Sequence, residues 1–200
     1  MDPVLMPVIA GVLGLLVVAS LVTAGLVARH RAKEQPVPEA VVNLRQRITA
    51  WWFMVAVLVG ATAVGPVGMF ALYILLSALA LREILSLART GPADHLALVV
   101  CFFVVLPSHY LFAMVGWYVM FLLAVPVYGF VAIAAALAFS GDTDHFLERM
   151  GILLWAVLVG VYFVSYVPMM QHLELPGADV GSARLPVFLV FVAQISDVFQ

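Results

Sequence analysis

Polar residues near the C-terminus have the clearest chemical potential in this sequence. Gln194, Ser196, Asp197 and Gln200 interrupt a stretch that is otherwise apolar. An ionisable residue inside a membrane segment is costly to bury and by default suggests a functional site. Because carboxylate oxygens suit Mg²⁺ and similar hard cations, Asp197 is a candidate metal ligand. Two other interpretations stay open: Asp197 could pair with a structural partner, and Gln194 could join helices by hydrogen bonding.

The spacing of these residues predicts a polar stripe on one helix. At about 100° per residue, Gln194, Asp197 and Gln200 fall within one arc of the helix surface. Asp197 follows Leu185 by twelve residues, which is about 18 Å of helix and reaches the inner half of a membrane. The sequence stops one residue after Phe199 without a flanking charge. We therefore expect an N-terminal portion of a longer enzyme, with catalytic residues beyond residue 200.

The composition is that of a membrane protein. Hydrophobic residues make up 66% of the 200 residues and charged residues only 10%, against about 25% charged residues in soluble chains. Cys101 is the single cysteine, so no disulfide framework forms within the chain. Phosphate-binding loops, zinc-binding helices and nucleophile-elbow motifs are absent from these residues. We expect membrane lipids, and no nucleic acid, among the partners.

About seven apolar segments follow one another along the sequence, and they predict an all-α polytopic bundle forming one domain over residues 1–200. A helix of about 20 apolar residues crosses a membrane. The expected spans are residues 3–28, 48–64, 67–88, 95–106, 117–139, 146–170 and an incomplete 185–200. Pro107 is expected to end the short fourth span and Pro126 to kink the fifth. A short interfacial helix is expected over residues 43–47.

The placement of basic residues orients these spans. If the N-terminus lies outside, the outer loops hold only Arg184 and the inner loops hold the other eight of nine basic residues. Those eight are Arg29, Arg31, Lys33, Arg45, Arg47, Arg82, Arg89 and Arg149. Glu83 falls on the inner side with Asp197 and could line the same cavity. Alternatively, Glu83 is solvated beside an Arg82 that extends to the interface.

An acidic cluster before the sixth span could be mistaken for a metal site. Asp142, Asp144, His145 and Glu148 lie close together in sequence but lack a recognised zinc spacing. We expect instead that Asp144 caps the helix and Glu148 complements its dipole. The polar residues near the outer face are expected to be interfacial: His109, Tyr110, His172 and Glu174.

The heptad from Gln194 to Gln200, Gln-Ile-Ser-Asp-Val-Phe-Gln, resembles a segment of the phosphatidate cytidylyltransferase (CDP-diacylglycerol synthase) family. Further stretches are also similar to that family: Asn43 to Ile48 leading to Trp51-Trp52, Leu81-Arg82-Glu83, Gly116-Trp117-Tyr118 and Val125-Pro126-Val127-Tyr128. The resemblance covers most of the chain, and only the final heptad is chemically specific. The family's C-terminal signature does not occur in these 200 residues.

The resemblance implies a multi-pass enzyme of a bacterial-type inner membrane, active on the cytoplasmic side. Such an enzyme joins CTP to phosphatidate, giving CDP-diacylglycerol and pyrophosphate. Asp197 would then bind Mg²⁺ or a similar divalent cation, and Gln194, Ser196, Gln200 and Glu83 would contact substrate.

Four alternatives concern assembly and function. The chain could be a transporter or channel component with Asp197 as an ion site, or a non-catalytic half that pairs with a separate catalytic chain. We also allow for a homodimer and for a lipid substrate related to phosphatidate.

Overall fold

The computed structural model describes residues 5–33, 36, 38–88, 91–173 and 183–199, which contain helices and no strand. Six of the helical segments are long and apolar enough to cross a membrane, which confirms the all-α multi-pass architecture. They are Leu5–Ala32, Glu39–Val64, Pro66–Leu87, Pro92–Val115, Tyr118–Phe139 and Phe146–His172. The expected seventh segment is α10 (Arg184–Phe199), of which Arg184–Gln194 counts as a shorter apolar helix.

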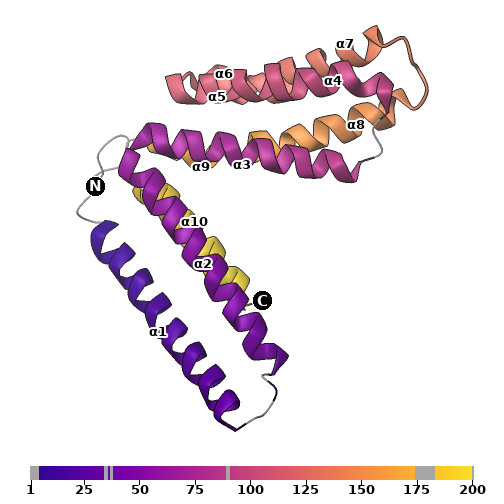
Figure 1. The fold of residues 1–200 in the computed structure, drawn as a ribbon. Coiled ribbons are helices and arrows are strands. Elements are labelled where there is room, and N and C mark those ends of the chain that lie inside the picture. The colour runs from indigo at the N-terminus through magenta and orange to yellow at the C-terminus, as the bar shows by residue number, and fades with distance from the viewer. Residues whose placement is uncertain (1–4, 34–35, 37, 89–90, 174–182, 200) are drawn as a thin grey trace. The chain divides into compact units, whose positions relative to one another are not determined.

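Contacts divide the chain into two compact units, residues 1–68 and 69–200. The single domain expected from the sequence stays a prediction. In the first unit, α1 (Leu5–Ala32) and α2 (Glu39–Val64) lie side by side (Figure 1). The expected interfacial helix is not separate, because α2 begins at Glu39 and runs without a break into the second span.

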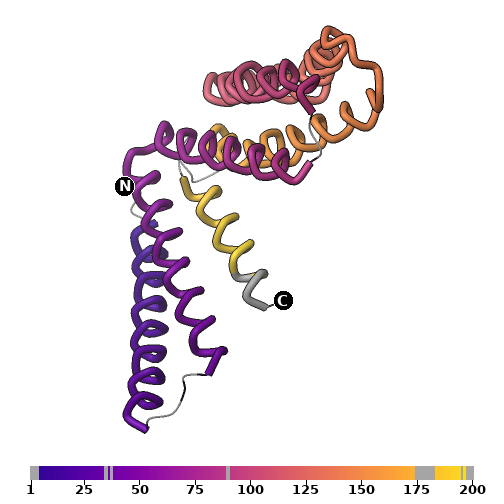
Figure 2. Tube along the Cα trace, turned by 45° about the vertical axis from the view of Figure 1, so that its right-hand side comes forward, coloured from indigo at the N-terminus to yellow at the C-terminus, as the bar shows by residue number. Residues whose placement is uncertain are grey.

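The second unit packs four spans in two layers. One layer holds the span from η1 (Pro92–Asp94) through α4 (His95–Val100), η2 (Cys101–Val105) and α5 (Leu106–Val115), beside the next span. That next span consists of α6 (Tyr118–Leu123), η3 (Ala124–Gly129) and α7 (Phe130–Phe139). The other layer pairs α3 (Pro66–Leu87) with the sixth span, as Figures 1 and 2 show. That span comprises α8 (Phe146–Val157), η4 (Leu158–Phe163), α9 (Val164–Met169) and η5 (Met170–His172).

Pro107 does not end the fourth span, and that expectation is wrong. The helix passes through Pro107 to Val115 because the preceding segment η2 adopts π-helical geometry. There the Leu106 N–H donates to the Cys101 carbonyl, five residues back. Proline lacks an N–H and clashes with the carbonyl four residues earlier, and local widening of the helix accommodates both effects. Pro126 likewise lies inside the π-helical segment η3.

A regular ridge on α3 forms one side of the core. Five of the six buried residues of α3 recur at every fourth position, as Met69, Tyr73, Ser77, Leu81 and Leu85, and the sixth is Phe70. Side chains four apart form one row along a helix, and such rows fit into the grooves of a neighbouring helix.

Large apolar side chains on the outside of the helices fit a lipid environment. Phe103, Phe139 and Leu147 are 76%, 83% and 82% exposed, respectively. Water-soluble monomers rarely expose extensive apolar surface. The exposed faces of these helices therefore support the assignment as membrane spans.

Gly160 lies at a close contact between α3 and η4. A Cβ atom built on Gly160 would lie 3.2 Å from the Leu81 backbone nitrogen and 3.3 Å from its Cα. Backbone atoms cannot move aside as a flexible side chain can. The absence of a side chain at Gly160 thus permits this contact.

We expect Gly160→Ala to destabilise the protein by about 1–3 kcal/mol, because the methyl group overpacks the α3–η4 contact. Gly160→Leu should be more disruptive. Thermal unfolding in detergent, followed by size-exclusion chromatography, would measure both. The control is Gly151→Ala on α8, where the added Cβ has nothing within 4 Å; it should leave stability unchanged or raise it slightly. Equal losses at both positions would contradict this packing.

Candidate active site

The expected polar stripe lies on the last helix, α10. Gln194 is partly buried and Ser196 is exposed there, and the helix extends through Asp197 to Phe199. Helical geometry at Gln194 and Asp197 agrees with the predicted common arc. The side chain of Asp197 and the whole of Gln200 fall outside the described part of the structure. Their roles as metal ligand and substrate contact therefore stay predictions.

Glu83 lies on α3 and is exposed. The Ser86 hydroxyl donates to the Glu83 carbonyl oxygen at 2.7 Å, and the Glu83 carboxylate forms no ion pair with the residues that the structure describes. The most extensive contacts of α10 are with α9 and η5. Glu83 is thus an available carboxylate, and its place beside Gln194 and Ser196 stays a prediction.

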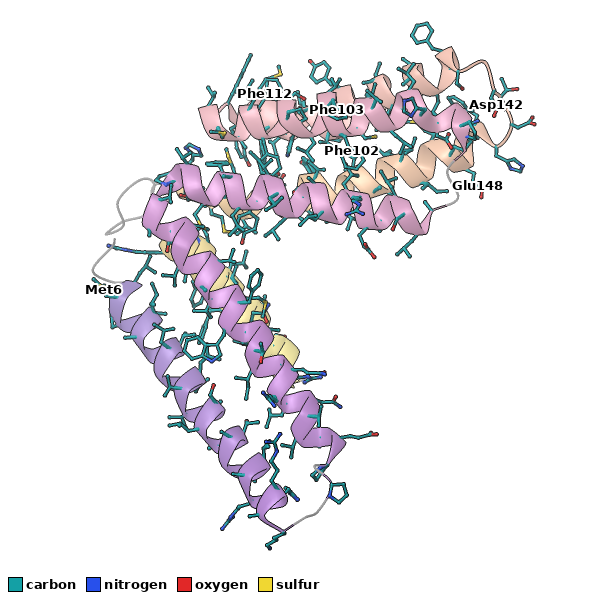
Figure 3. The ribbon with its side chains drawn as sticks, viewed as in Figure 1. Met6, Phe102, Phe103, Phe112, Asp142 and Glu148 are labelled. Carbon is teal, nitrogen blue, oxygen red and sulfur yellow. The ribbon has the colours of Figure 1, made fainter. Side chains whose placement is uncertain are left out.

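Arg149 forms an ion-pair network at the end of the bundle where Figure 3 labels Asp142 and Glu148. Its Nε donates to Asp94 Oδ1 at 2.6 Å, and its Nη1 lies 3.0 Å from Asp142 Oδ2. The second Asp94 oxygen accepts the Gly91 N–H at 2.7 Å. Asp94 is 3% exposed. A buried carboxylate requires a partner of opposite charge, and Arg149 is that partner. The network joins η1 to α8 and leaves Arg149 Nη2 buried without a hydrogen-bond partner.

The prediction that Asp144 caps the sixth span is wrong. His145 occupies the N-cap position with φ of 53°, and no side chain caps the helix there. Asp144 contributes its backbone: its N–H donates to Asp142 Oδ1, and its carbonyl accepts from Arg149 Nη1. Glu148 does lie in the first turn, as expected for an acidic residue near the positive end of the helix dipole. Arg149 therefore joins this loop, through the Asp142 and Asp144 carbonyls, to Asp94, which lies 55 residues away in the sequence.

His109 is buried in the core, so the expectation of an interfacial residue is wrong. Its Nε2 lies 2.7 Å from Ser165 Oγ, which itself donates to the Tyr162 carbonyl. The proton of that contact is therefore on Nε2. The imidazole stacks on Phe121 with ring centroids 4.7 Å apart. The contact joins α5 to α9 across the core. The sequence gives no indication of it, because the two residues lie 56 positions apart.

Tyr110 is also buried, and it joins α5 to α3. Its hydroxyl donates to the Tyr73 carbonyl at 2.9 Å and lies 2.7 Å from Ser77 Oγ. His172 is exposed on η5, in accord with the expected interface, and lies near Gly116. Glu174 lies outside the described residues.

The described residues do not assemble a metal centre. No group of three or more His, Cys, Asp or Glu side chains among them could hold an ion. The buried polar side chains of the second unit bond mainly to each other and stabilise the bundle. Of the expected site residues, the structure describes the side chains of Gln194 and Ser196 on α10 and of Glu83 on α3, and a site that joins them to Asp197 stays a prediction.

We expect Asp94→Ala to destabilise the protein by about 3 kcal/mol, because it leaves the buried Arg149 charge short of a partner. Thermal unfolding in detergent would show the loss. Asp144→Ala is the matched control, since Asp144 is exposed and enters the network through its backbone; it should change stability by less than about 0.5 kcal/mol. Similar melting curves for the two variants would refute the structural role of Asp94.

Comparison with known proteins identifies the family. The sequence profile of the cytidylyltransferase family matches residues 45–200. The chain is 28% identical over 156 residues to the uncharacterised protein YnbB of Escherichia coli strain K12, a match that covers 77% of this chain and 49% of YnbB. The chain thus spans about half the length of this curated relative. No solved structure matches it significantly. Since the profile covers the spans from α2 onward and the polar face of α10, the chain belongs to the cytidylyltransferase family.

Proposed function

We propose that the complete protein is a phosphatidate cytidylyltransferase, which converts CTP and phosphatidate, or a related phospholipid, to a CDP-lipid and pyrophosphate. The observation that carries the proposal is a cytidylyltransferase profile matched over residues 45–200 of a chain with six membrane-spanning helices. If the substrate that accepts the cytidylyl group comes from within the membrane, the simplest acceptor is the phosphate group of a lipid.

The reaction needs positioning more than covalent chemistry from the protein. A phosphate oxygen of the lipid attacks the α-phosphorus of CTP, and the bond from that phosphorus to the bridging oxygen breaks as pyrophosphate leaves. In phosphoryl transfer, orientation of the reactants and neutralisation of charge supply most of the catalysis. Gln194, Ser196 and Gln200 would orient phosphate or ribose groups, and Glu83 would contribute from α3.

A divalent cation such as Mg²⁺ would neutralise phosphate charge in this site. Asp197 is the residue that we propose to hold it, since a carboxylate flanked by amide side chains offers the oxygen ligands that a hard cation prefers. One carboxylate is only part of a magnesium site, and such sites commonly draw further ligands from water and substrate phosphates. The remaining catalytic residues would lie beyond residue 200.

The transporter alternative would use Pro126 and a short fourth span as breaks in a transport pathway. The fourth span is not short, because its helix extends through Pro107 to Val115. Pairing with a separate catalytic chain stays an alternative, and an activity assay separates it from the proposal.

We propose an inner-membrane location with the N-terminus outside and the active side in the cytoplasm. The orientation rests on the eight basic residues that would then lie in inner loops.

The decisive assay measures CDP-lipid formation from CTP, Mg²⁺ and phosphatidate in membranes. It should be run on the 200-residue chain and on the longest product of its gene. Activity in the longest product supports the proposal, and activity in neither rejects it for phosphatidate. If activity appears only after a second chain is added, the paired-chain alternative is correct.

We expect Asp197→Asn, made in the active form of the protein, to abolish CTP-dependent product, because the amide keeps the shape of the side chain but loses the charge that holds the cation. Radiolabelled CTP incorporation into lipid is the readout. Asp144→Asn removes an equal charge from an exposed loop and should retain activity. Turnover at the wild-type rate in Asp197→Asn would rule out the metal role.

The orientation can be tested with single cysteines in a Cys101→Ala background. Thr143→Cys and Leu173→Cys lie at exposed positions before and after the sixth span. We expect a membrane-impermeant maleimide to label Leu173→Cys on intact cells, and Thr143→Cys only after the membrane is opened. The reverse pattern would place the N-terminus inside.

A further inference from the structure

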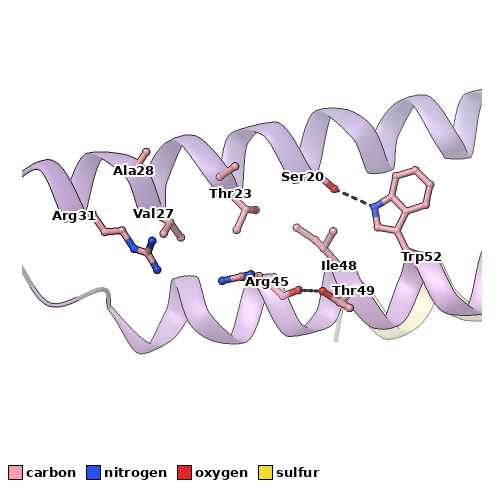
Figure 4. A pocket seen from close by; sticks show the side chains of 10 residues that line it. Ser20, Thr23, Val27, Ala28, Arg31, Arg45, Ile48, Thr49 and Trp52 are labelled. Carbon is pink, nitrogen blue, oxygen red and sulfur yellow. Dashed lines mark hydrogen bonds between the residues drawn. The ribbon is translucent and has the colours of Figure 1, made fainter.

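A cavity lined by two arginines and by uncharged side chains lies between α1 and α2, inside the unit of residues 1–68 (Figure 4). Its volume is about 480 Å³, within the usual range of ligand pockets of about 300–1,000 Å³. Both helices contribute side chains, and those with polar groups are Ser20, Thr23, Arg31, Arg45, Thr49 and Trp52. The remaining lining is apolar.

The charge of the lining changes along the helix axis. Arg31, in the last turn of α1, lies at one end of the cavity, and Arg45 comes from α2. At the other end, Trp52 Nε1 donates to Ser20 Oγ at 3.0 Å and closes the space between the helices. Ser20 precedes Arg31 by eleven residues, which is about 17 Å of helix. The cavity is therefore charged near Arg31 and uncharged toward Trp52, as a phospholipid is charged at its phosphate and uncharged along its acyl chains.

The two arginines lack an anionic partner among the residues that the structure describes. Figure 4 shows both guanidinium groups directed into the space between α1 and α2. Both side chains are exposed, and two like charges beside one cavity repel each other. A bound anion would relieve this repulsion, and guanidinium groups bind phosphate with two parallel hydrogen bonds.

The hydroxyl groups of the lining do not supply competing donors. Thr23 donates to the Ala19 carbonyl at 2.8 Å, and Thr49 to the Arg45 carbonyl at 2.9 Å. Their oxygens stay free to accept. The donors left for an anion are the Arg31 and Arg45 guanidinium groups, so recognition would depend on charge.

We propose that this cavity binds an anionic phospholipid, with the lipid phosphate between Arg31 and Arg45 and the glycerol and upper acyl chain along the deeper lining. Ser20, Thr23 and Arg31 belong to α1, which precedes the residues 45–200 shared with the family. Arg45, Thr49 and Trp52, on α2, lie within the matched residues, so the site combines a family segment with a helix outside the match. Its occupant is a structural lipid that holds α1 on α2.

The test measures phospholipid retained by the purified protein. Wild-type and variant proteins are reconstituted in phosphatidylcholine nanodiscs doped with phosphatidylglycerol, then released into detergent and analysed by native mass spectrometry. We expect Arg31→Gln/Arg45→Gln to retain about tenfold less phosphatidylglycerol than wild type, as the loss of charged hydrogen bonds implies. Phosphatidylcholine retention should not change.

The matched control is Arg29→Gln/Arg47→Gln. It removes one positive charge from each of the same helices, at positions that do not line the cavity, and it should bind lipid as wild type does. An equal loss in the control would mean that general surface charge attracts the lipid, and would overturn the proposal. A second variant, Ala24→Phe, keeps every charge and fills the cavity. It should also reduce retention, and unchanged binding in this variant would refute the cavity as the site.

Excess inorganic phosphate distinguishes a lipid site from a phosphate site. We expect it to leave bound phosphatidylglycerol in place, because the apolar part of the cavity holds the acyl chain. Complete displacement by phosphate would overturn the assignment to a lipid. None of these measurements uses CTP, so the result stands or fails independently of the proposed cytidylyl transfer.

Discussion

The fold depends on one constraint: inside a lipid bilayer, each backbone N–H and C=O must find its partner within the protein. Helices meet this constraint locally, and the six candidate spans are helical from end to end. Proline is the exception, because it removes a donor. Around Pro107 and Pro126 the helices adopt π geometry and continue. These two widened segments also pack together, since a Cβ built on Gly129 of η3 would lie 3.4 Å from Val105 Cγ1 of η2.

Most buried polar side chains follow the same rule, although the Gln171 amide is buried without a hydrogen-bond partner among the described residues. In the second unit the Tyr110–Ser77, His109–Ser165 and Arg149–Asp94 pairs join different helices and stabilise the bundle. In the first unit Arg31 and Arg45 point into a cavity without a described acidic partner. The contrast separates polar groups that build the scaffold from polar groups available for binding.

Predictions from sequence succeeded where the signal is local and failed where a distant residue decides. The positions of the spans follow from runs of apolar residues, and the helix through Gln194 and Asp197 follows from periodicity. The cap expected at Asp144 failed because Arg149 draws the loop toward Asp94. The interfacial position expected for His109 failed because Ser165, 56 residues away, provides a partner in the core.

The sequence alone determined the membrane class, the helical spans and the polar residues of the last helix, because hydrophobicity and helical period depend only on neighbouring residues. The family resemblance found in its final heptad agrees with the match over residues 45–200. Tertiary structure decided which polar groups are paired, how the prolines are accommodated and that α1 and α2 enclose a basic cavity. Those features depend on residues far apart in the sequence, whose contacts arise only when helices pack at particular registers and faces.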